Sequence, residues 1–215
     1  MTITAQQVLQ LLKLNESKNP YVLSPPPTKA KSGSGTYTFG YVQLDVGNNS
    51  LAATALQNIL TYALNASGQY IIDPSNTQNR LNDSVVSGLV SDAESTSSTS
   101  ISAADLANID LAMDSAYGQA EVNAVSAQWI NQYVLPGAAA IASGAKSTDA
   151  TFASSDLAQL FFADAVNQGS PRFQKELKNF LATGIGSNGS PAAMSNSSTR
   201  GRVKLLHLAS GGRVG

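Results

Sequence analysis

Apolar residues recur every three or four positions along most of the chain, a spacing that predicts amphipathic helices. Helices are expected at 3–16, 51–66, 81–94, 137–145 and 156–169. A further helix is expected to begin at Ser102, which forms a capping box with Asp105, and another to carry the apolar stripe from Val122 to Tyr133. A last core helix is expected after Ser170-Pro171. Residues 156–169 form the most apolar segment, and its predicted inward face carries Leu157, Leu160, Phe161 and Ala165. The pattern therefore predicts a mainly α fold.

One stretch near the N-terminus breaks this pattern. Residues 36–44 are rich in β-branched and aromatic side chains, which favour strands, and Gly40 interrupts them at a point expected to be a bulge, a bend or a close approach of a ligand. Turn residues follow from Asp45, and Asn49 or Ser50 is expected to cap the next helix. We expect one small β-hairpin beside a helical core, entered through the proline-rich segment 19–31.

Composition excludes several classes of function. With 13% charged residues and a net charge of −1, the chain has no extended basic surface for nucleic acid. The absence of cysteine removes disulfides, thiolate metal sites and cysteine nucleophiles, and one histidine, His207, leaves little basis for a serine triad. No cluster has the spacing of metal ligands, so we expect neither a metal nor another cofactor. We also expect no signal peptide and no membrane span.

The chain changes character after the last predicted helix. Residues 1–182 are expected to form one helical domain, and 183–199 are rich in Gly, Ser and Asn, as in a flexible linker. Residues 200–215 form a short basic and apolar tail that we place outside the fold. The tail is a docking peptide for another module or protein, a remnant of another module, or a vector-derived sequence.

Three features together resemble the lysozyme superfamily. These are a first helix that ends at Glu16, the hairpin sequence Thr36-Tyr37-Thr38-Phe39-Gly40, and a late apolar helix with Asp164-Ala165-Val166-Asn167-Gln168-Gly169. The superfamily includes phage-type lysozymes, goose-type muramidases, lytic transglycosylases and chitosanases. The resemblance covers most of residues 3–182 as a pattern of elements, and it implies an α+β lysozyme-like fold.

The resemblance implies roles for particular side chains. Glu16 would be the general acid, and the negative end of the helix dipole favours its protonated form. Thr38 or Thr36 would hold the attacking water or steady charge near the anomeric carbon. Aromatic and amide groups of the hairpin would bind sugar rings, namely Tyr37, Tyr41 and Gln43.

The position of a second carboxylate stays open. Phage lysozymes and chitosanases carry an acidic residue between the catalytic Glu and the hairpin threonine, whereas residues 17–37 here contain none. Asp45 is the nearest candidate, although an Asp in such a turn more often caps its own backbone. If Asp45 reaches the cleft, a retaining or an inverting hydrolysis is available. Otherwise Glu16 would act alone, as the goose-type and transglycosylase branches imply. Asp164 is expected to be a buried structural carboxylate.

Two functions from different classes follow. The first is a bacterial or phage glycosidase that cleaves β-1,4-linked amino-sugar polymers, peptidoglycan before chitin or chitosan, and is secreted or delivered to the cell wall or periplasm. The second is a non-catalytic scaffold of a phage or secretion system that binds a glycan or a protein. A carboxylic acid set in a groove favours the first, and an exposed Glu16 with no groove favours the second.

Overall fold

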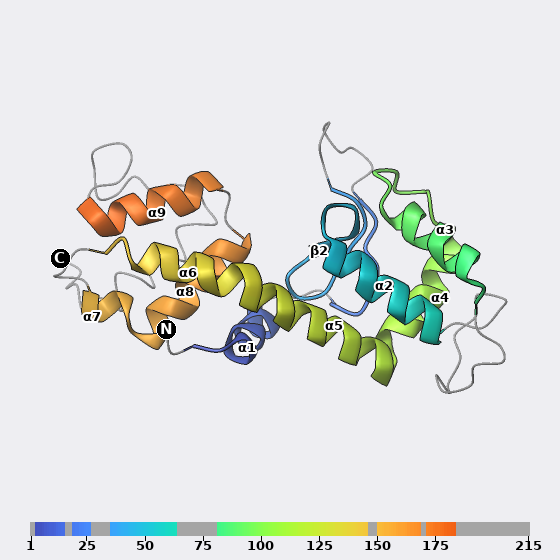
Figure 1. The fold of residues 1–215 in the computed structure, drawn as a ribbon, viewed down its shortest axis with the longest axis horizontal. Helices are drawn as coiled ribbons and strands as arrows, with labels where there is room; N and C mark the ends of the chain where they lie inside the picture. Colours follow the sequence, from blue (N-terminus) through green and yellow to red (C-terminus); the bar gives the residue numbers. More distant parts are fainter. Residues whose placement is uncertain are drawn as a thin grey trace. The chain divides into compact units, whose positions relative to one another are not determined.

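The computed structural model describes residues 3–15, 19–26, 35–63, 81–145, 150–168 and 171–183. It is mostly helical, with a two-stranded antiparallel sheet near the N-terminus, which confirms the predicted fold class (Figure 1). The elements in chain order are α1 (Ala5–Asn15), β1 (Thr38–Phe39), β2 (Leu44–Asp45), the 3-10 turn η1 (Val46–Asn48), α2 (Ser50–Ala63), α3 (Asp83–Ala93), α4 (Ala103–Asp114), α5 (Ala116–Trp129), the π-helical turn η3 (Ile130–Val134), α6 (Leu135–Ala142), α7 (Ala150–Ala153), α8 (Asp156–Gln168) and α9 (Pro171–Thr183).

Contacts divide the chain into two compact units. The expected domain over 1–182 stays a prediction. One unit runs from Lys13 to Trp129, and the other joins Met1–Leu12 to Ile130–Gly215. The predicted linker and tail, at 184–215, lie outside the described residues. None of the described helices is long and apolar enough to cross a bilayer.

The unit of residues 13–129 is built on α2. This helix packs against α3, α4, α5 and η1, with Leu56, Ile59 and Leu60 fully buried (Figure 1). Because η1 follows β2 directly, its packing on α2 fixes the hairpin to the helical core. The hairpin contributes Phe39 and Leu44 to the same buried set.

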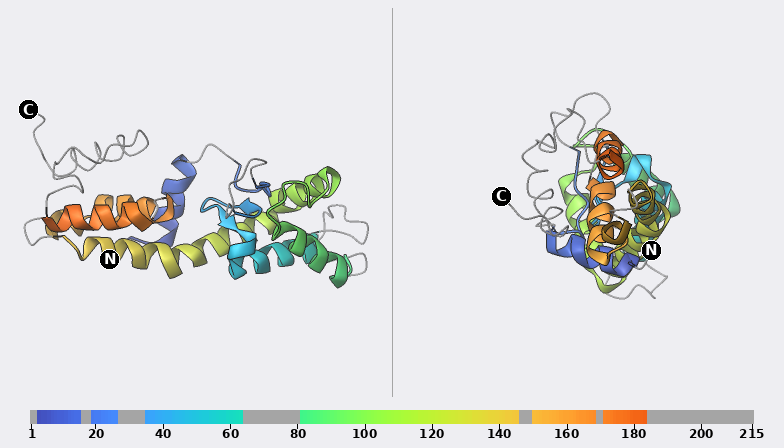
Figure 2. Two further views of the ribbon diagram at one scale, coloured as in Figure 1. Left: turned by 90° about the horizontal axis from the view of Figure 1, so that it is seen from above. Right: turned by 90° about the vertical axis from the view of Figure 1, so that its left-hand side faces the viewer.

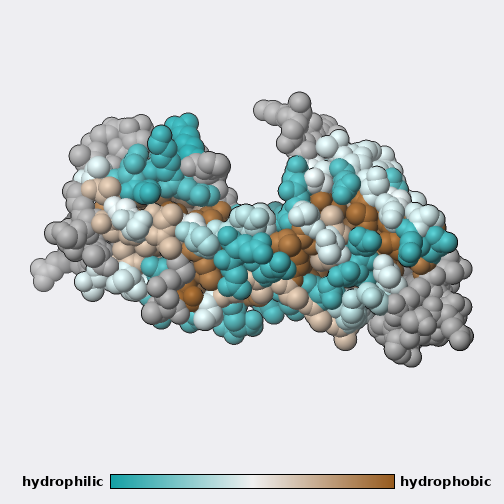
Figure 3. Space-filling model, in the orientation of Figure 1, coloured by the Kyte–Doolittle hydropathy of each residue, from teal (hydrophilic) through white to brown (hydrophobic). Residues whose placement is uncertain are grey.

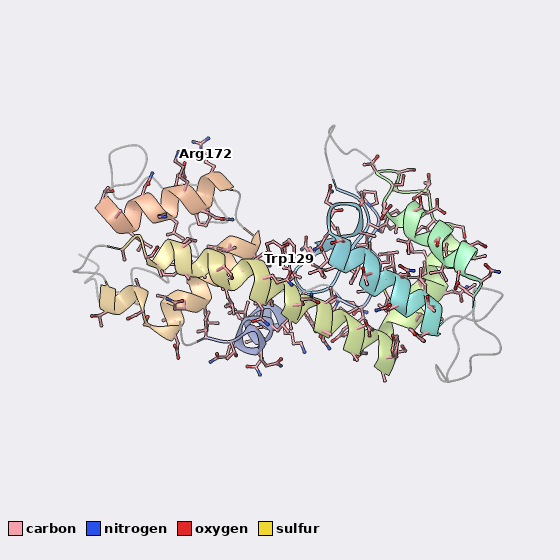
Figure 4. All side chains as sticks on the ribbon, in the orientation of Figure 1. Trp129 and Arg172 are labelled. Atoms are coloured by element: carbon pink, nitrogen blue, oxygen red, sulfur yellow. The ribbon has the colours of Figure 1, made fainter. Side chains whose placement is uncertain are left out.

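The other unit is built on α6, which packs against η3, α8 and α9. The views in Figure 2 show α9 running beside α6. Leu177 and Leu181 are buried on α9, whereas Arg172, Lys175 and Lys178 are exposed and give this helix a hydrophilic outer face (Figure 3). Arg172 points away from the helix (Figure 4), where it pairs with Glu176 at 3.0 Å.

Several helices begin at the capping residues that the sequence indicates. The Thr4 hydroxyl accepts from the Gln7 amide at 3.3 Å, and the Gln7 side chain accepts from the Thr4 amide at 2.7 Å. The Ser102 hydroxyl accepts from the Asp105 amide at 3.1 Å, which confirms Ser102 as the predicted cap, and it donates to the Asp105 carboxylate at 2.6 Å. The Asn49 side chain accepts from the Leu51 amide at 3.0 Å. Each of these bonds satisfies a donor that the first helical turn leaves unpaired.

Two predicted faces are wrong by about one position. Tyr133 was placed on the inward stripe that begins at Val122, but it is 53% exposed, and Ile130 and Val134 are buried instead. The π-helical turn causes this change, because its wider turn breaks the 3.6-residue register. Leu157 is 55% exposed, and the buried face of α8 carries Ala158, Phe162 and Ala165. Asp164 is buried, as expected.

Candidate functional site

The hairpin is short and tightly turned. Thr38 pairs with Asp45 and Phe39 with Leu44, so four residues, 40–43, connect the strands. Gly40 has a φ of 78°, a conformation that glycine adopts without strain, and a Cβ at this position would lie 3.1 Å from the Ser126 hydroxyl. The predicted interruption at Gly40 is therefore a turn that lies directly on α5.

A third extended segment pairs with the hairpin. The Ser24 amide donates to the Thr38 carbonyl at 2.8 Å, and the Thr38 amide donates to the Ser24 carbonyl at 2.9 Å. Residues that exchange both backbone bonds project their side chains to the same side of the pair. The Gly40 amide adds a bond of 2.8 Å to the Pro20 carbonyl. The segment 19–26 is thereby fixed along the outer edge of β1.

A small hollow lies between this segment and the hairpin. Its volume is about 50 Å³, and its lining is uncharged, formed by Asn19, Pro20, Val22, Ser24, Thr38, Phe39, Gly40, Tyr41 and Gln43. Ser24 and Thr38 both line it, and their hydroxyls take no part in the hydrogen bonds found among the described residues. At this size it accommodates one substituent of a sugar ring, because sites that enclose whole ligands measure about 300–1,000 Å³.

Tyr41 forms one wall of the hollow and is held by three contacts. Its ring meets that of Tyr21 edge to face, with 6.0 Å between the centroids, and the two hydroxyls are 3.5 Å apart. The Tyr21 hydroxyl also lies 3.4 Å from the Asn123 side-chain oxygen on α5. The Lys13 ammonium, from the last turn of α1, lies 5.2 Å from the centre of the Tyr41 ring, within cation–π range. Burial, together with the neighbouring Tyr21 hydroxyl, raises the pKa of Tyr41 to about 12, so its hydroxyl stays protonated at neutral pH.

Asp45 is bound within the hairpin itself. The Thr36 hydroxyl and amide donate to its carboxylate, and the Asn48 side chain donates at 3.0 Å. The Thr36 hydroxyl in turn accepts from the Gly47 amide at 2.7 Å. Partial burial raises the pKa of the Asp45 carboxyl, but the bonds from Thr36 and Asn48 outweigh that effect and hold the pKa below its usual value. Asp45 is therefore an ionised clamp of the turn.

Asp110 on α4 anchors the segment beside the hollow. Its carboxylate accepts from the Leu23 amide at 2.8 Å, while the Leu23 side chain is buried in the core. The flanking residues, Val22 and Ser24, line the hollow on the other side. Burial raises the pKa of Asp110 and exceeds the opposing effect of the Leu23 amide.

The predicted sugar-contact and catalytic residues of the hairpin other than Asp45 fall into two groups. Thr38, Tyr41 and Gln43 line the same hollow. Tyr37 is fully buried with its hydroxyl 3.4 Å from the Ile101 amide, and Thr36 is buried with its hydroxyl bound to Asp45. Both side chains are therefore bound within the fold: Tyr37 lies in the core, and the Thr36 hydroxyl bonds to Asp45 and Gly47 in the turn.

Glu16 lies outside the described residues. Asn19, three positions later in the sequence, is the first of the residues that line the hollow.

Sequence patterns did not predict the contribution of residues 19–24. The prolines correctly indicate an extended segment, but its pairing partner Thr38 is set by tertiary packing and leaves no local signal. Lys13 and Asn123 were missed for the same reason, since each reaches the tyrosine pair from a distant element.

Comparison with known proteins adds no relative. No family profile, curated protein or solved structure matches this chain. Within the described ranges, no three or more His, Asp or Glu side chains lie close enough together to hold a metal ion.

Proposed function

We propose that this chain is a lysozyme-like glycosidase that cleaves β-1,4-linked amino-sugar polymers, with peptidoglycan as the substrate and Glu16 as the proton donor. It would act at the cell wall of a bacterium, as a secreted or phage-delivered protein. One observation carries the proposal: Thr38, expected to hold the attacking water or steady charge, lines the same hollow as Tyr41 and Gln43, expected to bind sugar rings. A lining with hydroxyl, amide and two aromatic side chains matches the alternating polar edges and apolar faces of a sugar.

Glu16 is suited to the role of acid by its position in the chain. It immediately follows α1 and precedes Asn19 at the hollow by three residues. In the proposed reaction it donates its proton to the glycosidic oxygen, the bond to the anomeric carbon breaks, and a water or the substrate's own acetamido group attacks that carbon. The Ser24 and Thr38 hydroxyls can each donate to and accept from a substrate or a water in the hollow.

A second function, glycan binding without cleavage, is favoured by the state of Asp45. Both of its oxygens accept bonds from Thr36, and one also accepts from Asn48, so its lone pairs are committed to the hairpin. A carboxylate committed in this way is a poor nucleophile or base. In a cleaving enzyme this arrangement favours the mechanism in which Glu16 acts without a second carboxylate.

The decisive experiment compares the wild-type protein with Glu16→Gln on insoluble peptidoglycan and on chitosan. Soluble reducing ends measure cleavage, and product masses separate hydrolysis from anhydro-forming cleavage. Glu94→Gln is the matched control, because Glu94 is an exposed glutamate of the same unit at the end of α3. We expect at least a hundredfold loss for Glu16→Gln alone, with an unchanged circular dichroism spectrum. Full activity in Glu16→Gln removes Glu16 from the mechanism, and an inactive wild type that still binds the polymer favours the scaffold.

A further inference from the structure

The hollow has an uncharged lining, but a lysine ammonium, that of Lys13, contacts the ring of the lining residue Tyr41. None of the nine lining residues is charged. The Lys13 ammonium lies 5.2 Å from the ring centre of Tyr41, which forms part of that lining. Lys13 does not line the hollow itself, but it is exposed and contacts the ring of a lining residue.

The charge distribution along the sequence supports this reading independently. Residues 1–44, which supply every lining residue, contain four lysines and a single acid: Lys13, Lys18, Lys29, Lys31 and Glu16. Residues 45–183 contain 13 of the 14 acidic residues and only five basic ones. The first 44 residues, which include every lining residue, thus carry a net positive charge, whereas residues 45–183 are acidic and the tail 200–215 is basic. Positive charge favours the approach of anionic ligands.

Asp45 and Asp110, the acidic residues described beside the hollow, do not neutralise the positive charge of Lys13. Asp45 is bound to Thr36 and Asn48, and Asp110 accepts from the Leu23 amide on the core side of the segment. Neither carboxylate lines the hollow or forms an ion pair with Lys13.

From these observations we propose that Lys13 is a specificity-determining residue that selects sugars bearing a carboxylate over neutral and cationic amino sugars. The carboxylate binds the ammonium at the Tyr41 wall while the adjoining sugar substituent occupies the hollow. Tyr41 positions Lys13, because its ring face restricts the ammonium to this edge. The inference rests on the proposed function for the choice of sugars, and it identifies as the ligand class a carboxylate-bearing saccharide of a bacterial wall, namely muramic acid units whose lactyl group carries no peptide, rather than chitosan.

The test measures binding, so that it is independent of cleavage. Three disaccharides serve as probes: N-acetylglucosaminyl-N-acetylmuramic acid, which carries a carboxylate, neutral diacetylchitobiose, and cationic chitobiose. Each is titrated into the full chain while the backbone amide resonances of Thr38 and Gly40 are followed by NMR. We expect the wild type to bind the carboxylated probe about tenfold more tightly than the neutral one, with the difference shrinking as salt is added.

Variants assign that preference to Lys13. Lys13→Met should abolish the preference and leave affinity for the neutral probe unchanged, and Lys13→Arg should restore it. Tyr41→Phe retains the ring face and should keep the preference for the carboxylated probe over the neutral one, whatever its absolute affinities, whereas Tyr41→Leu should lose the preference. Lys175→Met, an exposed lysine of the other unit, is the control and should have no effect.

The outcomes separate this inference from the proposed function. A carboxylate preference that survives in Lys13→Met, or equal binding of all three probes by the wild type, overturns the role of Lys13 even if peptidoglycan is cleaved. If the preference depends on Lys13 but the protein cleaves no polymer, the role of Lys13 is upheld and the proposed glycosidase activity is rejected.

Discussion

Asp45 and Thr36 hold the hairpin closed from one side: the carboxylate of Asp45 accepts from both the hydroxyl and the amide of Thr36. The hydroxyl of Thr36 also accepts from the Gly47 amide, so one threonine links the entry of the hairpin to the turn after it. This clamp places β1 where Thr38 can line the hollow.

The clamp makes stability depend on acid pH. The pKa of Asp45 is lower in the folded chain than in the unfolded one, so the carboxylate stabilises the fold above its unfolded pKa of about 4, and the contribution is lost as the pH falls through the folded pKa. Asp45→Asn should cost about 1–2 kcal/mol of unfolding free energy at pH 7. Urea titrations from pH 7 down to pH 2.5 should show the difference from wild type shrinking.

Asp92→Asn, an exposed carboxylate on α3, controls for the general loss of negative charge. A deficit in Asp45→Asn that is the same at every pH would show that the charge of Asp45 is not what the hairpin uses.

Asp110 should behave in the opposite way. Its pKa is raised in the folded chain, so its contribution is most favourable below the unfolded pKa and is lost as the pH rises through the folded pKa. Asp110→Asn retains an acceptor for the Leu23 amide and removes the charge, and it should equal or exceed wild-type stability at pH 7. Asp110→Ala leaves that amide unpaired and should cost about 1–3 kcal/mol. Thermal unfolding of the two variants checks this order, and an Asn variant as unstable as the Ala variant contradicts it.

The turn at Gly40 should not tolerate a side chain. Gly40→Ala must adopt a φ of 78° and place its Cβ 3.1 Å from the Ser126 hydroxyl, for an expected cost of about 1–3 kcal/mol. Gly88→Ala is the matched control, since it lies inside α3 with nothing within 4 Å of the added atom. It should stabilise the chain by about 0.5–1 kcal/mol. Urea unfolding of both variants tests the contrast, and equal effects would remove the backbone argument.

Gly137 allows α6 and α8 to approach closely. A Cβ at this position would lie 2.8 Å from a methyl group of Val166, so Gly137→Ala should destabilise by about 1–3 kcal/mol through overpacking. Shortening the facing residue in the double variant Gly137→Ala/Val166→Ala should recover part of that loss. A double-mutant cycle measures the coupling, and strictly additive costs would show that the two side chains do not compete for space.

Local signals predicted the elements well. Helix starts at Thr4, Asn49 and Ser102 follow from short polar side chains that cap the first turn, and such bonds depend only on neighbours in sequence. The hairpin follows from its β-branched run, because strands of this kind exclude helix-forming residues.

Features set by tertiary packing escaped prediction. The exposed Tyr133 follows from a π-helical turn that no residue pattern announces, and the exposed Leu157 follows from which face of α8 meets α6. At the site, sequence indicated Thr38 and Tyr41 but missed Ser24, because a cross-strand partner fourteen residues away leaves no periodic trace.

The pair of backbone hydrogen bonds between Ser24 and Thr38 has a consequence for protein engineering. These bonds join segment 19–26 to β1, and Asp45 separately holds Thr36 at the entry of the hairpin. The two segments that line the hollow are therefore held together without help from the chain that connects them. Doubling the length of such a connection costs only about 0.6 kcal/mol of closure entropy. A reporter or affinity peptide inserted between Pro26 and Gly35 should therefore leave the hollow assembled, which makes this stretch a natural attachment point for following occupancy of the hollow from outside.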